Sequence, residues 1–265
     1  MDYGLRGRVA LVNAASKGIG RAIAEALAAE GVRLVISARN GEVLGRTAAE
    51  IAAAHSRCKV VPVAADVAQA GTAERLVGEA VTRFGRLDIL VNNSGGPPAG
   101  TFADLDDAAW QAAFELLLLS VVRMVRAAVP HLRASGHGRI VNVASFSVKQ
   151  PIPGLILSNS LRAGVVGLAK TLADELAPAG ITVNTVCPGR IMTDRTRAAH
   201  RDRAQREGVP VDDIVQAVHR TEVPLGYVGD PADMGHAVAF LCSDAAGYIT
   251  GVTLPIDGGL LRGLY

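Results

Sequence analysis

A turn near the N-terminus carries residues suited to holding a phosphate group. Asn13–Gly20 reads Asn-Ala-Ala-Ser-Lys-Gly-Ile-Gly and lies between an apolar run that ends at Val12 and an alanine-rich stretch. Small side chains let main-chain N–H groups approach phosphate oxygens, and the start of a helix adds a partial positive charge. A strand, this turn and a helix in that order therefore predict a phosphate site, although glycine-containing turns alone are common.

The elements around this turn alternate between short strands and longer helices. The runs that predict strands are Arg8–Val12, Arg33–Ser37, Lys59–Ala64, Leu87–Asn92, Arg139–Ala144, Ile181–Val186 and Val252–Ile256. The stretches that predict helices are Gly20–Glu30, Glu42–His55, Thr72–Phe84, Asp107–Leu132, Ser158–Ala177 and Pro231–Cys242. We expect one α/β domain over residues 1–265: a Rossmann-type, doubly wound, seven-stranded parallel sheet with helices on both faces.

Composition narrows the class of protein. The chain is 49% hydrophobic but only 4% aromatic, which suits buried parallel strands under closely packed helices. A net charge of +2 without a basic stripe predicts no nucleic-acid partner. Neither the three cysteines nor the six histidines have metal-ligand spacing, so no metal is expected. Without a signal peptide or an apolar run of membrane-spanning length, we expect a cytoplasmic protein with no membrane partner.

A set of landmarks along the chain resembles the short-chain dehydrogenase/reductase family. They are the turn Asn13–Gly20, Asp66-Val67, Asn92-Asn93-Ser94-Gly95, Pro188-Gly189 with Thr193, and Gly251 through Asp257-Gly258-Gly259. Their order and spacing match the family from about residue 6 to residue 260, and they are most similar to its 3-oxoacyl-carrier-protein reductase-like members. The resemblance implies a nicotinamide dinucleotide cofactor and oxidoreductase activity.

The resemblance also implies which residues bind the cofactor. They are Asn13, Ala15, Ser16, Lys17, Gly18, Ile19, Gly20, Arg39, Asp66, Val67, Asn93, Gly95, Arg162, Pro188, Gly189, Ile191 and Thr193. The turn departs from the family at Ala14, where glycine is usual. If φ is positive there, the methyl group costs about 1 kcal/mol, and if φ is negative the change is nearly free.

The end of the second predicted strand indicates which nicotinamide cofactor is preferred. A carboxylate there would accept the ribose 2′-OH of NAD and repel a 2′-phosphate. The sequence instead reads Ser-Ala-Arg-Asn at 37–40, with no acid before Glu42. Lys17 and Arg39 could both reach a 2′-phosphate, unless both are ordinary surface cations. We therefore predict NADP, with NADPH preferred over NADH.

The catalytic positions do not follow the family pattern. Relatives reduce a carbonyl with a Tyr that donates the proton, a Lys four residues later, a Ser and an Asn. Counting from the landmarks, these positions hold Ser158, Arg162, Ser145 and Leu117. The tyrosines of the chain lie elsewhere in the sequence, at Tyr3, Tyr227, Tyr248 and Tyr265. Neither a serine hydroxyl nor a guanidinium is a good general acid near neutral pH.

Ser145, Ser158 and Arg162 are nevertheless the candidate catalytic residues. Together they could stabilise an oxyanion, with the proton coming from water or from the substrate. Arg162 lies one helical turn after Ser158 and could bind a carboxylate in the volume that the phenol leaves. Two alternatives stay open: Ser158 caps the helix N-terminus, and Arg162 contacts only the cofactor riboses. Lys149, in a loop, is another possible acid.

Residues 190–228 interrupt the alternation of strands and helices. Arg190–Arg206 within them holds six arginines. A long insert after a strand is where α/β folds place a lid over the ligand, so we expect a substrate lid or, alternatively, a solvated helical excursion. The predicted helices Asp107–Leu132 and Ser158–Ala177 are apolar around much of their circumference, and relatives pair them between subunits. This predicts a homotetramer.

The favoured function is an NADP-dependent oxidoreductase of a carbonyl or alcohol. The arginines favour a small-molecule substrate that is anionic or an acyl thioester. The alternative is a cofactor-binding sensor or partner subunit without redox activity. A third hypothesis is an enzyme in which Arg162 transfers a proton without net redox chemistry. The sequence identifies neither the substrate nor the reaction direction.

Overall fold

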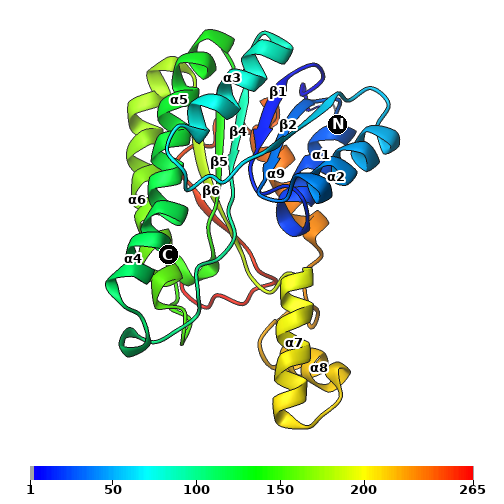
Figure 1. The fold of residues 1–265 in the computed structure, drawn as a ribbon, viewed down its shortest axis with the longest axis vertical. Coiled ribbons are helices and arrows are strands. Elements are labelled where there is room, and N and C mark those ends of the chain that lie inside the picture. Colours follow the sequence, from blue (N-terminus) through cyan, green and yellow to red (C-terminus); the bar gives the residue numbers. More distant parts are fainter. Residues whose placement is uncertain (1–2, 265) are drawn as a thin grey trace.

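The computed structural model describes residues 3–264, without the side chains of residues 218–220, so Tyr265 and the first two residues of the predicted domain lie outside it. A parallel sheet of seven strands, in the order β3-β2-β1-β4-β5-β6-β7, forms the centre (Figure 1). The strands are β1 (Val9–Val12), β2 (Arg33–Ala38), β3 (Val60–Ala64), β4 (Ile89–Asn92), β5 (Arg139–Val143), β6 (Thr182–Pro188) and β7 (Thr253–Ile256). The predicted fold class is confirmed.

Strand order places a crevice beside β1. The chain winds outward from β1 through β2 to β3, then returns to pair β4 with the other edge of β1. The connections that leave β1 and β4 therefore diverge to opposite sides of the sheet. Ligands of open α/β sheets bind beyond the carboxyl ends of such a strand pair. Here those ends are Val12 and Asn92, next to the predicted phosphate turn and the Asn93 segment.

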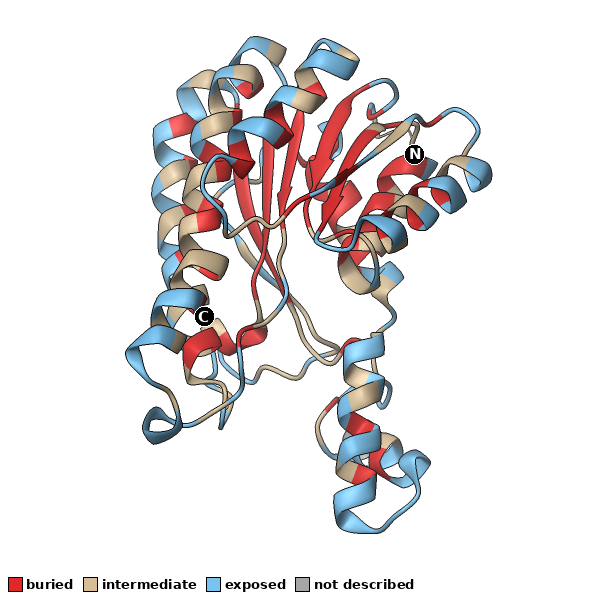
Figure 2. Ribbon diagram, in the orientation of Figure 1, coloured by how far each residue is buried: buried red, intermediate tan, exposed pale blue. Residues whose placement is uncertain are grey.

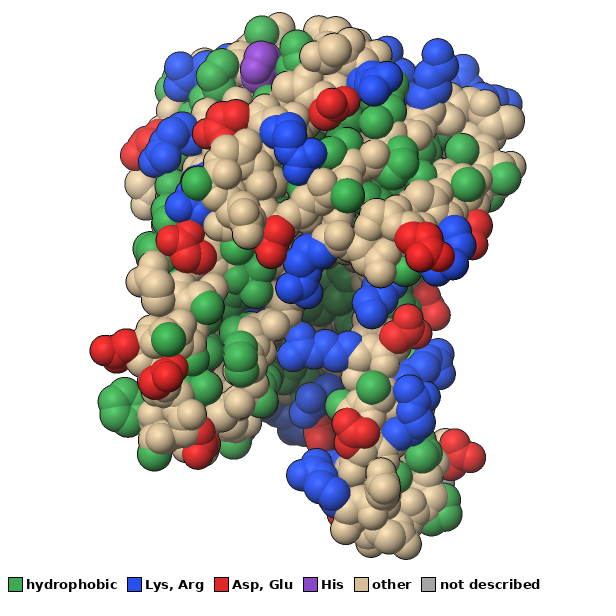
Figure 3. Space-filling model, viewed as in Figure 1, with side chains coloured by type: hydrophobic (Ala, Val, Ile, Leu, Met, Phe, Trp, Pro, Cys, Tyr) green, Lys and Arg blue, Asp and Glu red, His purple; other side chains and the backbone are tan. Residues whose placement is uncertain are grey.

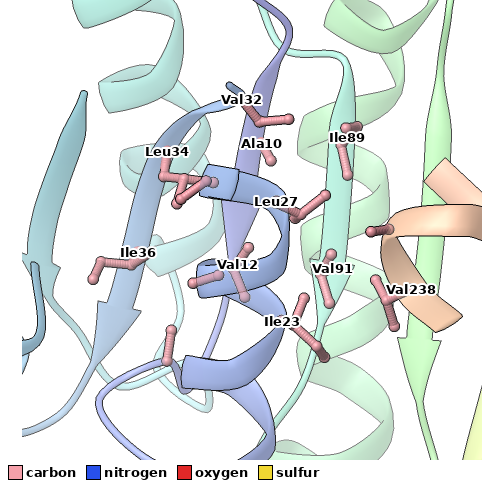
Figure 4. Close-up of a cluster of buried hydrophobic side chains, with 14 of the residues drawn as sticks. Ala10, Val12, Ile23, Leu27, Val32, Leu34, Ile36, Ile89, Val91 and Val238 are labelled. Carbon is pink, nitrogen blue, oxygen red and sulfur yellow. The ribbon is translucent and has the colours of Figure 1, made fainter. Parts of the chain in front are cut away.

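Helices cover both faces of the sheet and bury two apolar layers (Figure 2). On one face lie α1 (Gly18–Ala29), α2 (Gly41–Ala54) and α9 (Pro231–Cys242). Ile23 and Leu27 of α1 and Val238 of α9 pack there against Val12 and Val91 of the central strands (Figure 4). On the other face lie α3 (Thr72–Phe84), α5 (Ser120–Ser135) and α6 (Ile156–Leu176).

Two predicted helices differ from the structure in ways that bear on the site. The helix expected over Asp107–Leu132 is divided into α4 (Asp107–Phe114), a π-helical turn (Glu115–Leu119) and α5. The helix expected from Ser158 begins at Ile156, with Leu155 at the N-cap position. The side chain of Asn159 bonds both main-chain groups of Ile152, at 3.0 and 3.3 Å, and so holds the preceding loop against the first turn of α6.

The insert forms two helices, α7 (Asp194–Glu207) and α8 (Val211–Thr221), that project beyond the carboxyl edge of the sheet (Figure 1). Its two ends meet where Ile191 bridges Gly229, and Arg190 bonds Glu222 at 2.7 Å nearby. The insert is therefore tied at its base. Within residues 3–264, no helix is long and apolar enough to cross a membrane.

Candidate active site

The predicted phosphate turn leaves β1 through two residues with positive φ. Ala14 has φ of 51°, the one non-glycine residue in this region among those described, and Gly18 has φ of 58°. Because φ is positive, the methyl group of Ala14 strains the turn by about 1 kcal/mol. A β-carbon at Gly20 would collide with the Ala14 carbonyl and lie 2.8 Å from Asn93 Nδ2. Only glycine fits at that position without movement of the turn.

Neighbouring elements hold the turn by hydrogen bonds to its main chain and to the Asn13 side chain. Ser37 at the end of β2 donates its hydroxyl to Asn13 Oδ1 at 2.8 Å. Thr47 of α2 donates to the Ser16 carbonyl at 2.9 Å, and Asn93 after β4 donates to the Asn13 carbonyl at 3.3 Å. No side-chain capping bond is made at the start of α1, so its first N–H groups are open to a ligand.

The first turn of α1 has the properties of an anion site. Its N-cap residue, Lys17, makes no side-chain capping bond, and the turn contains no acidic residue. Thr193 packs against Gly18, so the segment before α7 closes over this turn. A β-carbon at Gly189 would lie 2.5 Å from the Asp257 Cα atom. The segments that follow β6 and β7 are therefore in close contact. Uncapped N–H groups and an unopposed helix dipole favour a phosphate here.

Other predicted cofactor residues surround this turn. Ala15 and Ile191 are buried, while Ser16, Ile19, Asn93 and Pro188 are half-buried and Gly95 is exposed. Beside the end of β2, a shallow hollow is lined by Arg39, Asp66 and Arg75 at the start of α3. Lys17 and Arg39 are exposed and form no ion pair with any described residue.

Ser145 follows β5 and begins a short 3-10 turn, Phe146–Val148. Its hydroxyl oxygen accepts a hydrogen bond from the Ser147 N–H at 3.1 Å. A serine hydroxyl can accept and donate at the same time, so the Ser145 proton remains available to a ligand. Buried Cys187 of β6 lies behind Ser145. Burial raises the pKa of the Cys187 thiol to about 11, so it stays neutral.

Ser158 is the third residue of α6 and is 8% exposed. The alternative interpretation, that Ser158 caps this helix, is wrong, because α6 begins two residues earlier. Its hydroxyl forms no hydrogen bond with any described residue, while neighbouring Asn159 holds the loop. Ser158 therefore offers an uncommitted hydroxyl one turn before Arg162 on the same helix.

Arg162 is held by main-chain carbonyl groups. Nη1 donates to the Val143 carbonyl at 2.9 Å, and Nη2 makes a longer contact of 3.5 Å with the Gly95 carbonyl. Burial, followed by the nearby Arg195 guanidinium, lowers the pKa of Arg162 to about 10. Arg162 is therefore a cation at neutral pH, positioned between the end of β5 and the loop after β4.

At the position where relatives have the Asn, this chain has an apolar residue. Leu117 lies in the π-helical turn and is buried. It lines a cavity of about 10 Å³ below Arg162, together with Ser120 and Asn142, which has room for about one water molecule. Asn92 also lines this cavity, and its side-chain oxygen has no hydrogen-bond partner among the described residues.

No other described side chain replaces the missing phenol. Tyr3 packs against Phe240, and Tyr227 and Tyr248 are largely exposed. Lys149 is exposed at the end of the 3-10 turn. The structure thus brings Arg162 to the end of β5 beside Ser145, and adds Arg195, which the sequence marked only as one arginine among several. Its guanidinium packs against Gly96, a contact that no sequence spacing could indicate.

Comparison with known proteins assigns the family. Residues 13–261 match the family model described as enoyl-(acyl carrier protein) reductase. The 3-oxoacyl-acyl-carrier-protein reductase FabG of Escherichia coli is 36% identical over 254 residues, which cover 96% of this chain and 97% of that protein.

Two solved structures extend the likeness to the fold. L-sorbose reductase from Gluconobacter frateurii, complexed with NADPH and L-sorbose, matches with a TM-score of 0.96 at 34% identity, over 100% of both chains. A variant of actinorhodin polyketide ketoreductase with NADPH matches with a TM-score of 0.89 at 34% identity, over 97% of this chain and 98% of that one. The chain belongs to the short-chain dehydrogenase/reductase family of oxidoreductases.

Proposed function

We propose that this oxidoreductase uses NADPH to reduce a carbonyl compound at a site made by Ser145, Ser158 and Arg162. The observation that carries the proposal is the phosphate turn, which leads along the β1–β4 crevice toward these residues. The residues present fit the cofactor: Gly20 has no room for a β-carbon, and α1 starts uncapped. Lys17 and Arg39 are free to meet a 2′-phosphate. When bound, NADPH supplies a hydride.

The residues of this chain stabilise negative charge but have no strong acid. Ser145 can donate a hydrogen bond to a carbonyl oxygen, and the uncommitted Ser158 hydroxyl can do the same. Arg162 remains charged and supplies a fixed positive field. None of these groups gives up a proton readily near neutral pH, so water must protonate an alkoxide product.

A second candidate substrate class follows from the missing phenol. Hydride addition to a carbon–carbon double bond conjugated with a carbonyl leaves an enolate rather than an alkoxide. An enolate is much less basic than an alkoxide, so it needs no local acid and is stabilised by a fixed cation such as Arg162. The family description, enoyl-(acyl carrier protein) reductase, refers to chemistry of that kind.

The test is a panel of NADPH oxidation assays. The panel contains saturated ketones, α,β-unsaturated ketones, 3-oxoacyl thioesters and quinones, each measured with NADPH and with NADH. We expect turnover with NADPH, and faster turnover of conjugated than of saturated carbonyls. Arg162→Gln should lower kcat/KM by about 100-fold if the guanidinium stabilises the oxyanion. NADPH binding without turnover of any compound would favour the non-redox sensor instead.

The insert and the outer helices bear on substrate access and on assembly. We take α7 and α8 to be the substrate lid, because their common base carries Thr193 against the phosphate turn. We take the assembly to be a homotetramer, formed through the α4–α5 and α6 faces. Light scattering that gave the mass of one chain would exclude it.

A further inference from the structure

Arg195 reaches from the first turn of α7 to the loop that follows β4. A β-carbon at Gly96 would lie 2.8 Å from Nη2 and 2.9 Å from Cζ of Arg195, and closer still to Nη1. The guanidinium therefore rests directly on the main chain of Gly96, where any other residue would displace it. This contact joins the projecting insert to the loop that Arg162 also touches, through the Gly95 carbonyl.

Neither guanidinium group has a counter-ion among the residues that the structure describes. Arg195 is close enough to lower the pKa of Arg162, and no carboxylate acts on Arg162 in the opposite direction. Within the described residues, neither arginine forms an ion pair, although other arginines of the insert, such as Arg190 and Arg203, do. Like charges held near each other are unfavourable, so an anion between them would bind well. Lys and Arg side chains gather around the hollow between α7 and the sheet (Figure 3).

The position of Arg162 indicates what kind of anion fits. Its guanidinium is fixed at the Val143 carbonyl, just before Ser145, and Ser158 lies one turn away on α6. An anionic group on this guanidinium would lie beside the oxygen that the two hydroxyl groups stabilise. A planar carboxylate matches the guanidinium fork, which can bind it through two parallel hydrogen bonds.

We propose that Arg162 and Arg195 together bind a carboxylate of the substrate, so that the preferred substrate is a keto acid with its carboxylate close to the reacting carbonyl. The assignment rests on the proposed function and narrows its substrate class. Arg195 is the specificity-determining residue, because it comes from the insert and is exposed, whereas Arg162 is half-buried beneath it. The rival ligand is a phosphate of the cofactor, since Thr193 near Arg195 packs against the phosphate turn.

Binding of a non-reducible carboxylate separates these possibilities. The full-length protein is saturated with NADPH and titrated calorimetrically with oxamate, and oxamide serves as its uncharged counterpart. We expect oxamate to bind and oxamide to bind far more weakly. Arg195→Gln should weaken oxamate binding by about 10- to 100-fold and leave the NADPH dissociation constant within about two-fold. Arg197→Gln, an exposed change on the same helix, should alter neither.

A second variant displaces the charge without removing it. Gly96→Ala puts a methyl group where the Arg195 guanidinium rests, and should weaken oxamate binding in the same direction as Arg195→Gln. The proposal is overturned if Arg195→Gln weakens NADPH instead, which would assign the residue to the cofactor. Equal effects on oxamate and oxamide would also overturn it. If the protein binds oxamate as expected but oxidises NADPH with no carbonyl compound, the proposed function fails while the carboxylate site stands.

Discussion

The two ends of the crevice are built on different principles. At the cofactor end, β2, α2 and the segment after β4 hold a turn by hydrogen bonds to its main chain and to the Asn13 side chain, and the proposed phosphate contacts are main-chain N–H groups. At the proposed catalytic end, side chains would have to act on the substrate, and the candidates are two serines and an arginine. Main-chain recognition tolerates a change such as Ala14, whereas proton transfer depends on the pKa of a particular group. One scaffold can therefore keep its cofactor site while its chemistry changes.

Restoring the family residues at the catalytic end should have the largest effect. Ser158→Tyr with Arg162→Lys supplies a phenol and a cation that lowers its pKa, beside Ser145. We expect kcat/KM for a saturated ketone with NADPH to rise by about 100- to 10,000-fold, because a general acid contributes that much. The matched control, Ser158→Phe with Arg162→Lys, fills the same volume without the hydroxyl. Equal rates for the two double variants would show that the missing acid does not limit the parent.

At the cofactor end, a single added methyl group should be enough to disrupt NADPH binding. Gly20→Ala adds a β-carbon that collides with the Ala14 carbonyl and presses on Asn93. We expect NADPH binding, measured by fluorescence titration, to weaken on the order of 100-fold, because the turn must shift away from α1. Gly45→Ala is the control, since Gly45 lies in α2 with no atom near its added methyl. Unchanged binding in Gly20→Ala would mean that phosphates do not depend on this turn.

The choice between NADPH and NADH should depend on one exposed cation. Arg39→Ala is expected to weaken NADPH binding roughly 10-fold and leave NADH binding unchanged, since only NADPH carries a 2′-phosphate. Arg39 lines the hollow beside the end of β2 and forms no ion pair there, so its removal should not alter stability. Arg46→Ala on α2 provides an exposed-arginine control. A parallel loss for both cofactors would place Arg39 against a group that they share.

Raising the pH should weaken substrate binding at the catalytic end but not cofactor binding at the phosphate turn. The groups that face Arg162 are Arg195 and the Cys187 thiol, and burial lowers the pKa of Arg162 to about 10. Arg162 therefore loses its charge as the pH rises through about 10, while the unfolded chain, in which the pKa of this side chain is higher, stays protonated over a further pH window. Its contribution to stability rises in that window, because the unfolded state binds the proton more tightly. We expect the KM of a keto acid to increase several-fold between about pH 9 and about pH 10.5. The KM of a neutral ketone should stay constant, and a parallel rise would contradict the assignment.

Local patterns were enough to predict the strands and the turn after β1, and the family resemblance placed Ser145, Ser158 and Arg162 at the catalytic positions. The order of these elements predicted the sheet, because βαβ crossovers leave few arrangements. Two features needed the folded chain. The start of α6 depends on the bonds between Asn159 and Ile152, which override the preference of Ser158 for a cap. Arg195 meets Gly96 across the crevice, a contact between segments far apart in the sequence.

The smallest effect should come from a substitution of Ala14, the residue with positive φ in the phosphate turn. Its φ of 51° strains an alanine by about 1–2 kcal/mol, and Ala14→Gly relieves this. Glycine also costs about 0.5–1 kcal/mol in chain entropy, so the net gain lies between about 0 and about 1.5 kcal/mol. We expect Tm to rise by about 2 °C and NADPH affinity to change less than two-fold. A large gain in affinity would show that the methyl group holds the turn away from its binding conformation. In that case, the cofactor end has diverged as well as the catalytic end.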